Sequence, residues 1–228
     1  MKPSSASEPG AATSRPGKVF AVIVTFNRLP MLQQTLRHTL GEALDGVIVI
    51  NNASTDGTRA WLDEQRHPLL QVVHLPVNGG GAGGFHHGFD HVLQHTDADW
   101  LVCFDDDAYP QPGSIATFKA LALEPDVAGV AAAVYLPDGG ISEMNRPSHH
   151  PFASLGATLR TLFKRREGFH VQDADYQRTE PMTIDFSSFV GCFLRVSAIR
   201  QRLGLPRREL FIYADDIMYL SLIHISEP

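Results

Sequence analysis

The sequence predicts an α/β fold in which helices flank a doubly wound, mostly parallel sheet. Two observations support this prediction. Strand-like and helix-like stretches alternate five times before residue 137, an order typical of parallel sheets. The strand segments are also apolar over nearly their whole length, so that both faces of the sheet need cover. These segments are 18–27, 45–52, 69–76, 99–107 and 126–136.

The first strand segment, "KVFAVIVTFN", precedes a stretch with helical periodicity. Pro30 suits the first turn of a helix, which we expect to begin after Asn27. The apolar face of this helix repeats every three or four residues, at Leu29, Leu32, Leu36 and Leu40.

The second segment, "DGVIVINN", runs into the turn sequence "ASTDGT". Ser54 or Thr55 can accept hydrogen bonds from free backbone amides at the start of a helix. We therefore expect a second helix that carries Trp61 and Leu62 and begins at one of these caps.

The third segment, "LLQVVHLP", leads into "NGGGAGGF" and a helix expected over 83–95. Its glycines satisfy G-x-G-x-x-G, and an acidic residue follows about 20 positions later, as in dinucleotide-binding loops. That loop normally opens its fold, whereas this one follows the third strand. A turn without side chains still lets a backbone approach a ligand, and a helix N-terminus favours anions. A tight turn with no ligand is the alternative.

His87, His91 and His95 are spaced four residues apart on this third helix, as metal ligands can be. The apolar residues Phe85, Phe89, Val92 and Leu93 lie nearly opposite them at 100° per residue. We expect the histidines to face solvent.

The fourth segment, "WLVCFDDDAYP", ends in three consecutive aspartates, before a helix expected over 112–124. In an extended backbone Asp105 and Asp107 point one way and Asp106 the other. A solvated acidic turn is one interpretation. The alternative is a divalent cation, because carboxylate oxygens suit Mg²⁺ or Mn²⁺ and the ion removes the repulsion between them.

All four strands are thus followed by polar, small or acidic residues. In open α/β sheets, ligands bind beyond the carboxyl ends of the strands, where the strand order reverses. The sequence therefore predicts one binding crevice built from these four loops.

Composition excludes some functions. The 228 residues carry 19 Lys and Arg against 25 Asp and Glu, for a net charge of −6. A negative chain lacks the positive potential that binds the phosphate backbone of nucleic acids. The two cysteines sit in apolar runs without metal or disulfide spacing, which indicates a reducing, cytoplasmic compartment. Residues 1–17 lack the apolar core of a signal peptide, and we expect a disordered tail. No run reaches the length of a membrane span.

Six blocks together resemble one family. They are "VIVTFNR", "VINNASTDGT", "VNGGGAGGF", "FDDDAYP", "FVGCFLRVSAI" and "GLPRRELFIYADDIMY", in this order from about residue 19 to 219. The chain resembles family 2 inverting glycosyltransferases of the type A fold, the nucleotide-diphospho-sugar transferase fold. Within them it is most similar to galactofuranosyl and rhamnosyl transferases.

The resemblance implies a role for each matching residue. Thr25, Asn27, Arg28, Asn52, Asp56 and Asn78 would bind the nucleotide-sugar donor together with Asp105 and Asp106. Asp105 and Asp107 would hold Mn²⁺ or Mg²⁺. Asp216 would take the proton from the acceptor hydroxyl, while Asp215 would help to hold a sugar.

The implied function is metal-dependent transfer of galactofuranose or rhamnose from a nucleotide diphosphate to a cell-envelope glycan or lipid-linked acceptor. The bound ion stabilises the leaving diphosphate and a positioned base deprotonates the hydroxyl. An NAD(P)-dependent oxidoreductase and a non-catalytic sugar-nucleotide or glycan-binding remnant are the alternatives. The oligomeric state is left open.

We expect 18–136 to form the nucleotide-sugar-binding half and 137–228 the acceptor-side half of one domain. In the second half, "LGATLRTLFKRREG" predicts a helix with an apolar face and with basic residues near its C-terminus. The cations can simply complement the helix dipole, or can contact the inner face of a membrane peripherally. Phe186 and Phe189 could stack on a sugar or belong to the core. After Tyr219 the sequence departs from the family pattern, which we interpret as a truncated or foreign C-terminus that leaves the site incomplete.

Overall fold

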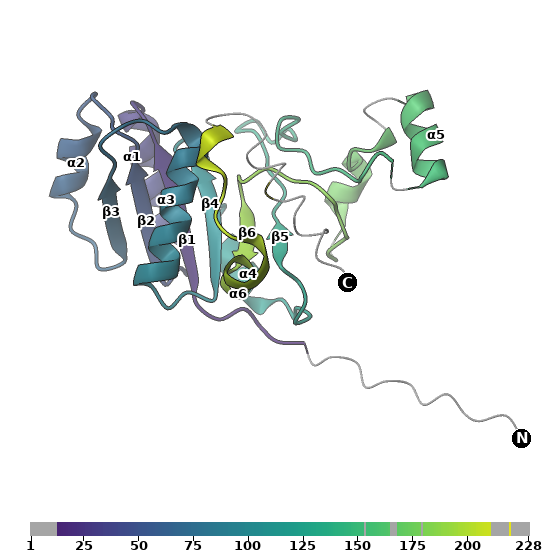
Figure 1. Ribbon diagram of the computed structural model, residues 1–228, viewed down its shortest axis with the longest axis horizontal. Coiled ribbons are helices and arrows are strands. Elements are labelled where there is room, and N and C mark those ends of the chain that lie inside the picture. The colour runs from purple at the N-terminus through teal and green to yellow at the C-terminus, as the bar shows by residue number, and fades with distance from the viewer. Residues whose placement is uncertain (1–12, 153, 165–167, 179, 211–218, 220–228) are drawn as a thin grey trace, which may run out of the picture.

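A six-stranded sheet forms the centre of the computed structural model, in the order β3-β2-β1-β4-β6-β5 (Figure 1). The structure describes residues 13–152, 154–164, 168–178, 180–210 and 219. The strands are β1 (Val19–Thr25), β2 (Gly46–Asn51), β3 (Leu70–His74), β4 (Trp100–Asp105), β5 (Gly129–Ala131) and β6 (Cys192–Arg195).

Strands β3, β2, β1 and β4 pair in parallel, and β6 pairs antiparallel with both β4 and β5. The predicted doubly wound, mostly parallel sheet is therefore confirmed. Strand β5 is shorter than the segment 126–136. Tyr135, from the end of that segment, bridges to Ile141 across a turn that contains Gly139, where φ is +86°.

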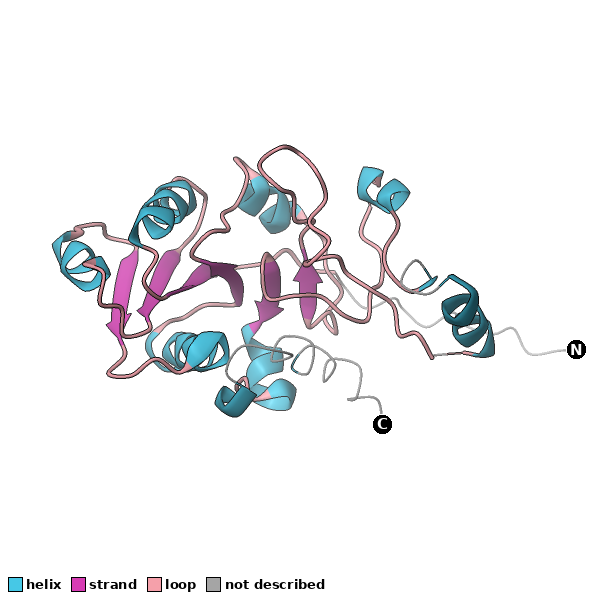
Figure 2. Cartoon of the chain, turned by 90° about the horizontal axis from the view of Figure 1, so that it is seen from above, coloured by secondary structure: helices cyan, strands magenta, loops and turns pink. Residues whose placement is uncertain are grey.

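Helices cover both faces of the sheet (Figure 2). One face carries α1 (Leu29–Leu40), α2 (Thr58–Glu64) and α4 (Ser114–Ala120), whose apolar residues share a buried cluster with Val19, Ala21 and Ile23 of β1. The other face carries α3 (Gly80–His95), the short α6 (Val196–Ala198) and the π-helical turn η3 (Ile199–Leu203), which pack with Val22 and Val24. Residues of β1 alternate between the two cores, which explains its continuous apolar run.

Three predicted helix boundaries were wrong. Helix α2 begins after Gly57, whose left-handed backbone at φ 92° forms the N-cap, and not at Ser54 or Thr55. Helix α3 begins at Gly80 instead of residue 83. Helix α4 spans only Ser114–Ala120, because Gly113 is left-handed at φ 83° and Leu121 is extended. Pro30 does occupy the first turn of α1, as predicted.

Glycines let α3 lie unusually close to β1. A Cβ atom at Gly84 would be 2.3 Å from Cγ1 of Val24, and one at Gly88 would be 2.4 Å from Cγ1 of Val22. Both distances are far below contact distance, so a larger residue would push the helix away from the sheet. The N-terminus of α3 is thereby held at the level of the carboxyl end of β1.

The second half is less regular. It contains α5 (Leu155–Lys164) and the 3₁₀ helices η2 (Asp173–Gln177) and η4 (Arg208–Leu210). Ser148 bridges to His170 and to Phe186, and the buried Arg146 guanidinium binds Asp173 and the carbonyl of Val171. These contacts join distant segments of the half into one unit.

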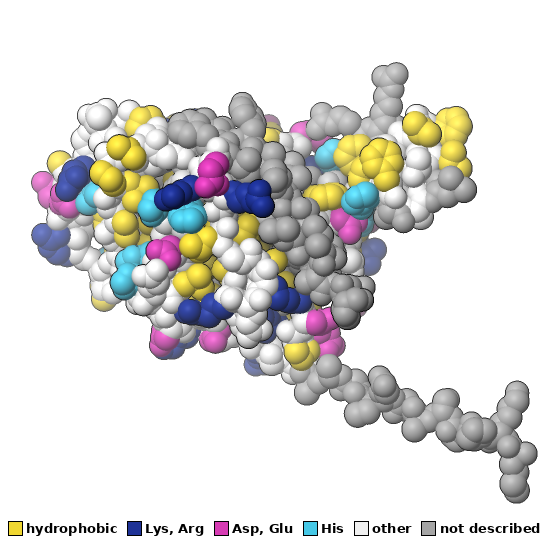
Figure 3. All heavy atoms as spheres, in the orientation of Figure 1, with side chains coloured by type: hydrophobic (Ala, Val, Ile, Leu, Met, Phe, Trp, Pro, Cys, Tyr) yellow, Lys and Arg dark blue, Asp and Glu magenta, His cyan; other side chains and the backbone are white. Residues whose placement is uncertain are grey.

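Helix α5 stands away from the sheet (Figure 1) and exposes apolar side chains, visible as a yellow patch in Figure 3. Leu162 and Phe163 are 68% and 85% exposed, and Phe152 before the helix is 64% exposed. Among the described residues, none of the helices combines the length and apolarity that crossing a bilayer requires.

Residues 13–17 belong to the predicted tail, yet Ser14 forms two backbone hydrogen bonds with Leu123. The remaining tail residues, 1–12, lie outside the described residues.

Candidate functional site

The acidic triplet lies where the strand order reverses. The chain builds outward from β1 to β2 and β3, then returns to place β4 on the other side of β1. Val24 and Asp105 are register partners at the carboxyl ends of these two strands. This is the predicted position for a ligand crevice in an open α/β sheet.

The three aspartates alternate as predicted. Asp105 and Asp107 are exposed, whereas Asp106 is only 5% exposed. Two carboxylates are therefore exposed at the edge where the ligand crevice is expected, and the third is buried in the protein.

Asp106 ties β4 to the loop after β1. Its carboxylate accepts hydrogen bonds from Thr25 Oγ1 at 2.9 Å and from the Phe26 amide at 3.3 Å. Its carbonyl accepts a further bond from Thr35 Oγ1 of α1 at 2.8 Å. Burial raises the pKa of Asp106, and these hydrogen bonds and Arg28 oppose that shift only in part. The observed contacts are structural, and the expected contact of Asp106 with a nucleotide stays a prediction.

Arg28 pairs with the exposed side of the triplet. Its NH1 atom lies 2.6 Å from Oδ2 of Asp107 and 3.5 Å from Oδ1 of Asp106. Asp106 chiefly raises the pKa of Arg28; partial burial opposes the shift and Asp107 adds to it. About half of the Arg28 and Asp107 side chains is exposed to solvent, at 55% and 49%.

The loops after β1 and β2 interlock. The Thr55 amide donates to Oδ1 of Asn27 at 2.6 Å, and the Asn27 amide donates to Oγ of Ser54 at 3.0 Å. Asn27 has a left-handed backbone, with φ 55°, which asparagine tolerates better than most residues. This interlock brings Asn27 and the second loop to the same edge as the triplet.

Asp56 is not an N-cap residue by position, but its carboxylate acts as a side-chain cap for the first amides of two helices. Its carboxylate accepts hydrogen bonds from the Leu29 amide of α1 at 3.0 Å and from the amide and hydroxyl of Thr58 in α2. Burial alone would raise the pKa of Asp56, but the bonds from Thr58 and Leu29 outweigh it and the pKa is lowered. The lowered pKa favours the ionised form of this exposed carboxylate, which lies between the starts of α1 and α2.

Two asparagines shape the glycine loop. Asn52 is 2% exposed, accepts from the Gly79 amide at 3.0 Å and donates to the Gly80 carbonyl at 2.8 Å. Asn78 accepts from the Gly80 amide at 2.8 Å. The backbone of Gly80 is left-handed, with φ +70°, a conformation that glycine adopts without steric cost. Asn52 and Asn78 thus fix the start of α3 beside the crevice.

Sequence reasoning missed one side chain at this edge. Tyr109 stacks on His38 of α1 with a centroid distance of 4.2 Å, and Gln34 Nε2 donates to its hydroxyl at 2.9 Å. The tyrosine holds the loop after β4 against α1. The signal available in the sequence was an aromatic residue two positions after the triplet.

Some residues that the sequence suggested for the site lie outside the described part of the chain. Asp215 and Asp216, the expected catalytic pair, lie outside the described residues. Tyr219, three residues after Asp216, is buried against Phe89 and Phe189 and donates its hydroxyl to the Gly204 carbonyl at 2.8 Å. Of the two candidate stacking residues, Phe189 therefore belongs to the core.

Phe186 is only partly buried and lies near the His150 ring, at a centroid distance of 5.9 Å. On α3, His87 and His95 are exposed, and His91 shares a hydrogen bond with Gln71 at 2.7 Å. Nowhere in the described part of the chain do three or more His, Cys, Asp or Glu side chains gather as a metal site.

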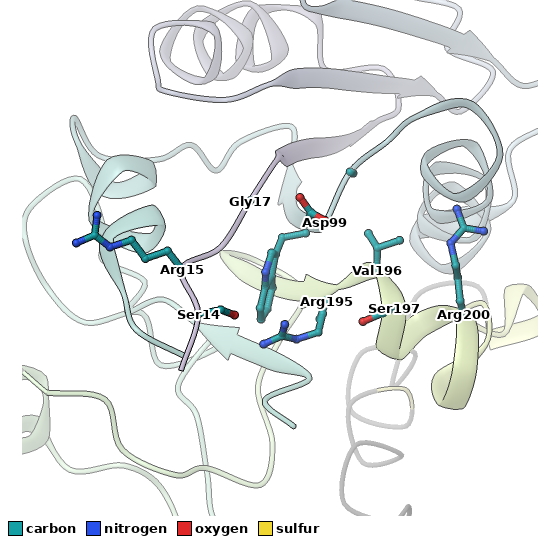
Figure 4. Close-up of a pocket in the computed structure, with 10 residues that line it drawn as sticks. Ser14, Arg15, Gly17, Asp99, Arg195, Val196, Ser197 and Arg200 are labelled. Carbon is teal, nitrogen blue, oxygen red and sulfur yellow. The ribbon is translucent and has the colours of Figure 1, made fainter. Parts of the chain in front are cut away.

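A hollow of about 370 Å³ lies at the opposite edge of the sheet, beside the start of β4 and the end of β6 (Figure 4). Figure 4 shows the Arg15 side chain pointing away from it, and Arg200 donates to the Leu93 carbonyl. The Arg195 guanidinium lies over the Trp100 ring at 4.6 Å and donates to the carbonyls of Val127 and Glu124. These arginines do not converge on a common point, so the acidic crevice is the better candidate.

The sequence profile described as "Glycosyl transferase family 2" matches residues 20–203, which include all six strands except Val19 of β1, and the acidic triplet with the loops beside it. The chain belongs to this family. Its membership sets aside the dinucleotide interpretation of the glycine loop, in agreement with the packing roles of Gly84 and Gly88.

Among curated proteins, an undecaprenyl-phosphate mannosyltransferase of Micrococcus luteus is 33% identical over 100 residues, which is 42% of this chain and 40% of that protein. The chain thus spans well under two thirds of this relative.

Solved structures of glycosyltransferases share the fold. A mannosyltransferase from Pyrobaculum calidifontis, solved with GDP-Man and Mn²⁺, superposes with a TM-score of 0.56 at 19% identity over 94% of this chain and 54% of its own. Residues 1–349 of S. aureus TarS give a TM-score of 0.56 at 15% identity over 92% and 56%. The predicted type A glycosyltransferase fold is confirmed.

Proposed function

We propose that this chain is the donor-binding part of a metal-dependent, inverting glycosyltransferase that transfers a sugar from a nucleotide diphosphate to a cell-envelope glycan or lipid-linked acceptor. One observation carries the proposal. In a family 2 chain, Asp105 and Asp107 face outward at the point where the strand order reverses, and the loops of β1, β2 and β3 gather at the same edge.

The exposed carboxylates fit a divalent cation. Asp105 and Asp107 would hold Mn²⁺ or Mg²⁺, because both ions prefer hard oxygen ligands. Two carboxylates leave coordination positions for diphosphate oxygens and water. When bound, the ion neutralises charge that develops on the leaving diphosphate. The Pyrobaculum enzyme, solved with GDP-Man and Mn²⁺, supports this assignment.

The donor would lie along the interlocked loops. Asn27, Arg28 and Asp56 expose polar groups toward solvent at this edge, and Asn78 is partly exposed beside them. Thr25 and Asn52 are buried, at 1% and 2%, so we assign them to positioning the triplet and the glycine loop. We assign Arg28 to the diphosphate, since a guanidinium can donate two parallel hydrogen bonds to phosphate oxygens.

The chemical step is a single displacement. The acceptor oxygen attacks the anomeric carbon as the bond to the diphosphate breaks, which inverts the configuration. We assign Asp216 as the base that takes the proton from the acceptor hydroxyl, and Asp215 to holding a sugar. Both assignments rest on the sequence resemblance.

The identity of the transferred sugar is the most specific part of the proposal. The sequence blocks favour galactofuranose or rhamnose, whereas two of the relatives are named as mannosyltransferases. A donor screen with UDP-galactofuranose, dTDP-rhamnose and GDP-mannose, read by product mass, decides between them. A polyprenyl phosphate and a short glycan should be tested as acceptors with each donor.

We also propose that the enzyme works in the cytoplasm at the inner face of the membrane. Cys103 and Cys192 are buried free thiols, as suits a reducing compartment. The exposed Leu162 and Phe163 of α5 could enter a bilayer interface. Leu162→Glu with Phe163→Glu should abolish sedimentation with phosphatidylglycerol vesicles, whereas Met144→Glu, at another exposed apolar residue, should not.

Nucleotide binding tests the function as a whole. UDP, GDP or dTDP should raise the melting temperature in the presence of Mn²⁺ more than in its absence. Stabilisation by NAD and by none of these nucleotides would restore the oxidoreductase alternative. Asp216→Asn should keep nucleotide binding and lose transfer; metal-dependent nucleotide binding without transfer to any acceptor would favour the non-catalytic remnant.

A further inference from the structure

We infer that Arg28 serves as an internal counter-cation for the acidic loop and exchanges its partner, from Asp107 to the donor diphosphate, when the divalent cation binds. This inference rests on the proposed function and deepens it. It makes Arg28 a positioning residue that couples metal binding to nucleotide binding.

The first step of the argument is the geometry of the ion pair. A single nitrogen, NH1, lies 2.6 Å from Asp107 and 3.5 Å from Asp106. Asp107 is one of the two carboxylates assigned to the cation. Arg28 therefore already supplies positive charge at a carboxylate that the metal would use.

The second step is that this contact can be exchanged. Both Arg28 and Asp107 are about half exposed, and exposed ion pairs contribute little net stability because water competes for both partners. Asp106 differs from Asp107, since it is buried and is fixed by Thr25 and the Phe26 amide. Movement of the guanidinium would also end its longer contact with Asp106, but the bonds of Asp106 to Thr25 and to the Phe26 amide would stay in place.

The third step is that only side chains need to move. The Arg28 carbonyl accepts hydrogen bonds from the amides of Met31 and Leu32, which anchor its backbone at the start of α1. On the other side, the Ala108 amide donates to the Asp105 carbonyl and closes a turn around Asp107. Rotation of the Arg28 side chain could therefore carry the guanidinium across the crevice while both loops stay fixed.

The fourth step is electrostatic. A divalent cation at Asp107 would repel the guanidinium, and without another anion the protein would gain the metal contact only by losing the ion pair. A diphosphate offers Arg28 a replacement partner with favourable geometry. Metal and diphosphate should thus each strengthen the binding of the other, and this coupling is reciprocal.

The test compares wild-type protein with Arg28→Met, which keeps much of the side-chain volume and removes the charge. Arg37→Met is the matched control, because Arg37 is exposed in the last turn of the same helix, whereas Arg28 lies at its start. The affinity for Mn²⁺ is measured by electron paramagnetic resonance without nucleotide, then with UDP and with GDP. Circular dichroism checks that each variant is folded.

We expect Arg28→Met to bind Mn²⁺ alone about two- to fivefold more tightly than wild type, as loss of a competing surface ion pair predicts. We also expect the enhancement of Mn²⁺ binding by the nucleotide to fall by about tenfold, the size expected for a charge-assisted contact. Arg37→Met should match wild type in both measurements.

Wild-type Mn²⁺ affinity and full nucleotide enhancement in Arg28→Met would overturn the exchange and leave the proposed function intact. Failure of the wild-type protein to bind Mn²⁺ with either nucleotide would overturn both the metal-dependent function and the exchange. Arg28→Lys separates charge from geometry: it should restore the weak binding of Mn²⁺ alone but only part of the enhancement. Full enhancement in Arg28→Lys would contradict the assignment of a bidentate diphosphate contact.

Discussion

Adjacent aspartates of the triplet have opposite surroundings, and a substitution should reveal the difference. Asp106 is buried under Thr25 and the Phe26 amide, so Asp106→Ala would leave a hydroxyl and an amide without their acceptor. Such a loss costs about 1–3 kcal/mol. Urea denaturation should show this destabilisation for Asp106→Ala. Unchanged stability would mean that the carboxylate does not hold the two strands together.

Asp107→Ala should have the reverse phenotype. Asp107 is half exposed and forms a solvent-exposed ion pair with Arg28, so its removal should leave the urea midpoint within error of wild type. Binding of UDP or GDP should then no longer respond to Mn²⁺ in isothermal titration calorimetry. Asp63→Ala, an exposed aspartate on α2, is the control and should keep the Mn²⁺ response. A retained response in Asp107→Ala would remove this carboxylate from the metal site.

The stability that Asp56 contributes should depend on pH. Asp56→Ala removes caps from α1 and α2, and a lost cap typically costs about 0.5–2 kcal/mol. Because the pKa of Asp56 is lowered on folding, its contribution is present above its unfolded pKa, near 3.9, and is lost as pH falls through the folded pKa. The stability difference between wild type and Asp56→Ala should therefore be constant at neutral pH and shrink below about pH 4. A difference that grows on acidification would contradict the cap.

At the scale of elements, close contact between α3 and β1 depends on two glycines. Gly88→Ala would place a Cβ atom 2.4 Å from Val22, and overpacking of a core usually costs about 1–3 kcal/mol. Gly83→Ala is the matched control on the same helix, since nothing lies within 4 Å of its added Cβ and alanine favours helix. Thermal unfolding should show a lower midpoint for Gly88→Ala and an equal or higher one for Gly83→Ala. Equal midpoints for Gly88→Ala and wild type would show that the helix can shift without cost.

Strands β1 to β4 and helix α1 were predictable because their signals are local: continuous apolar runs, leucines in helical register and Pro30 in a first turn. The start of α3 was not, because Gly80 adopts its conformation through contacts with Asn78 in the same loop and with Asn52, which lies on a distant segment after β2. The prediction that Ser54 or Thr55 caps α2 failed for a similar reason. Asp56 bonds Thr58 and also reaches back to Leu29 in α1, a contact that local cap preference cannot reveal.

For the whole molecule, the loop composition predicted one edge of the sheet as the candidate site, but not the contacts that join the loops there. The sequence placed polar residues after four strands, and the strand order makes these strands neighbours, so that the polar residues lie along one edge. The Thr25–Asp106 bond spans 81 positions in the sequence and the Arg28–Asp107 bond spans 79. Such pairs depend on the order of the strands in the sheet, which a single sequence does not contain.

The two edges of the sheet should therefore respond differently to a ligand. With UDP or GDP plus Mn²⁺ at about 100 times the dissociation constant, binding stabilises the folded state by about 2.7 kcal/mol. Amides that exchange only by global unfolding should then slow everywhere. Amides that exchange by local opening should slow only where the ligand makes contact, namely in the loops that contain Asn27, Thr55, Asn78 and Ala108.

Hydrogen exchange read by mass spectrometry can separate these two effects. Peptides from the opposite edge, around Ser14 and Ser197 beside the hollow, provide the internal reference, because their local opening does not involve the crevice. Selective protection of the crevice loops over this reference is the expected result. Protection centred on Ser14 and Ser197 would instead move the nucleotide to the amino ends of the strands. That result would leave the acidic triplet without a donor to bind, because the two edges are separated by the full length of β1 and β4.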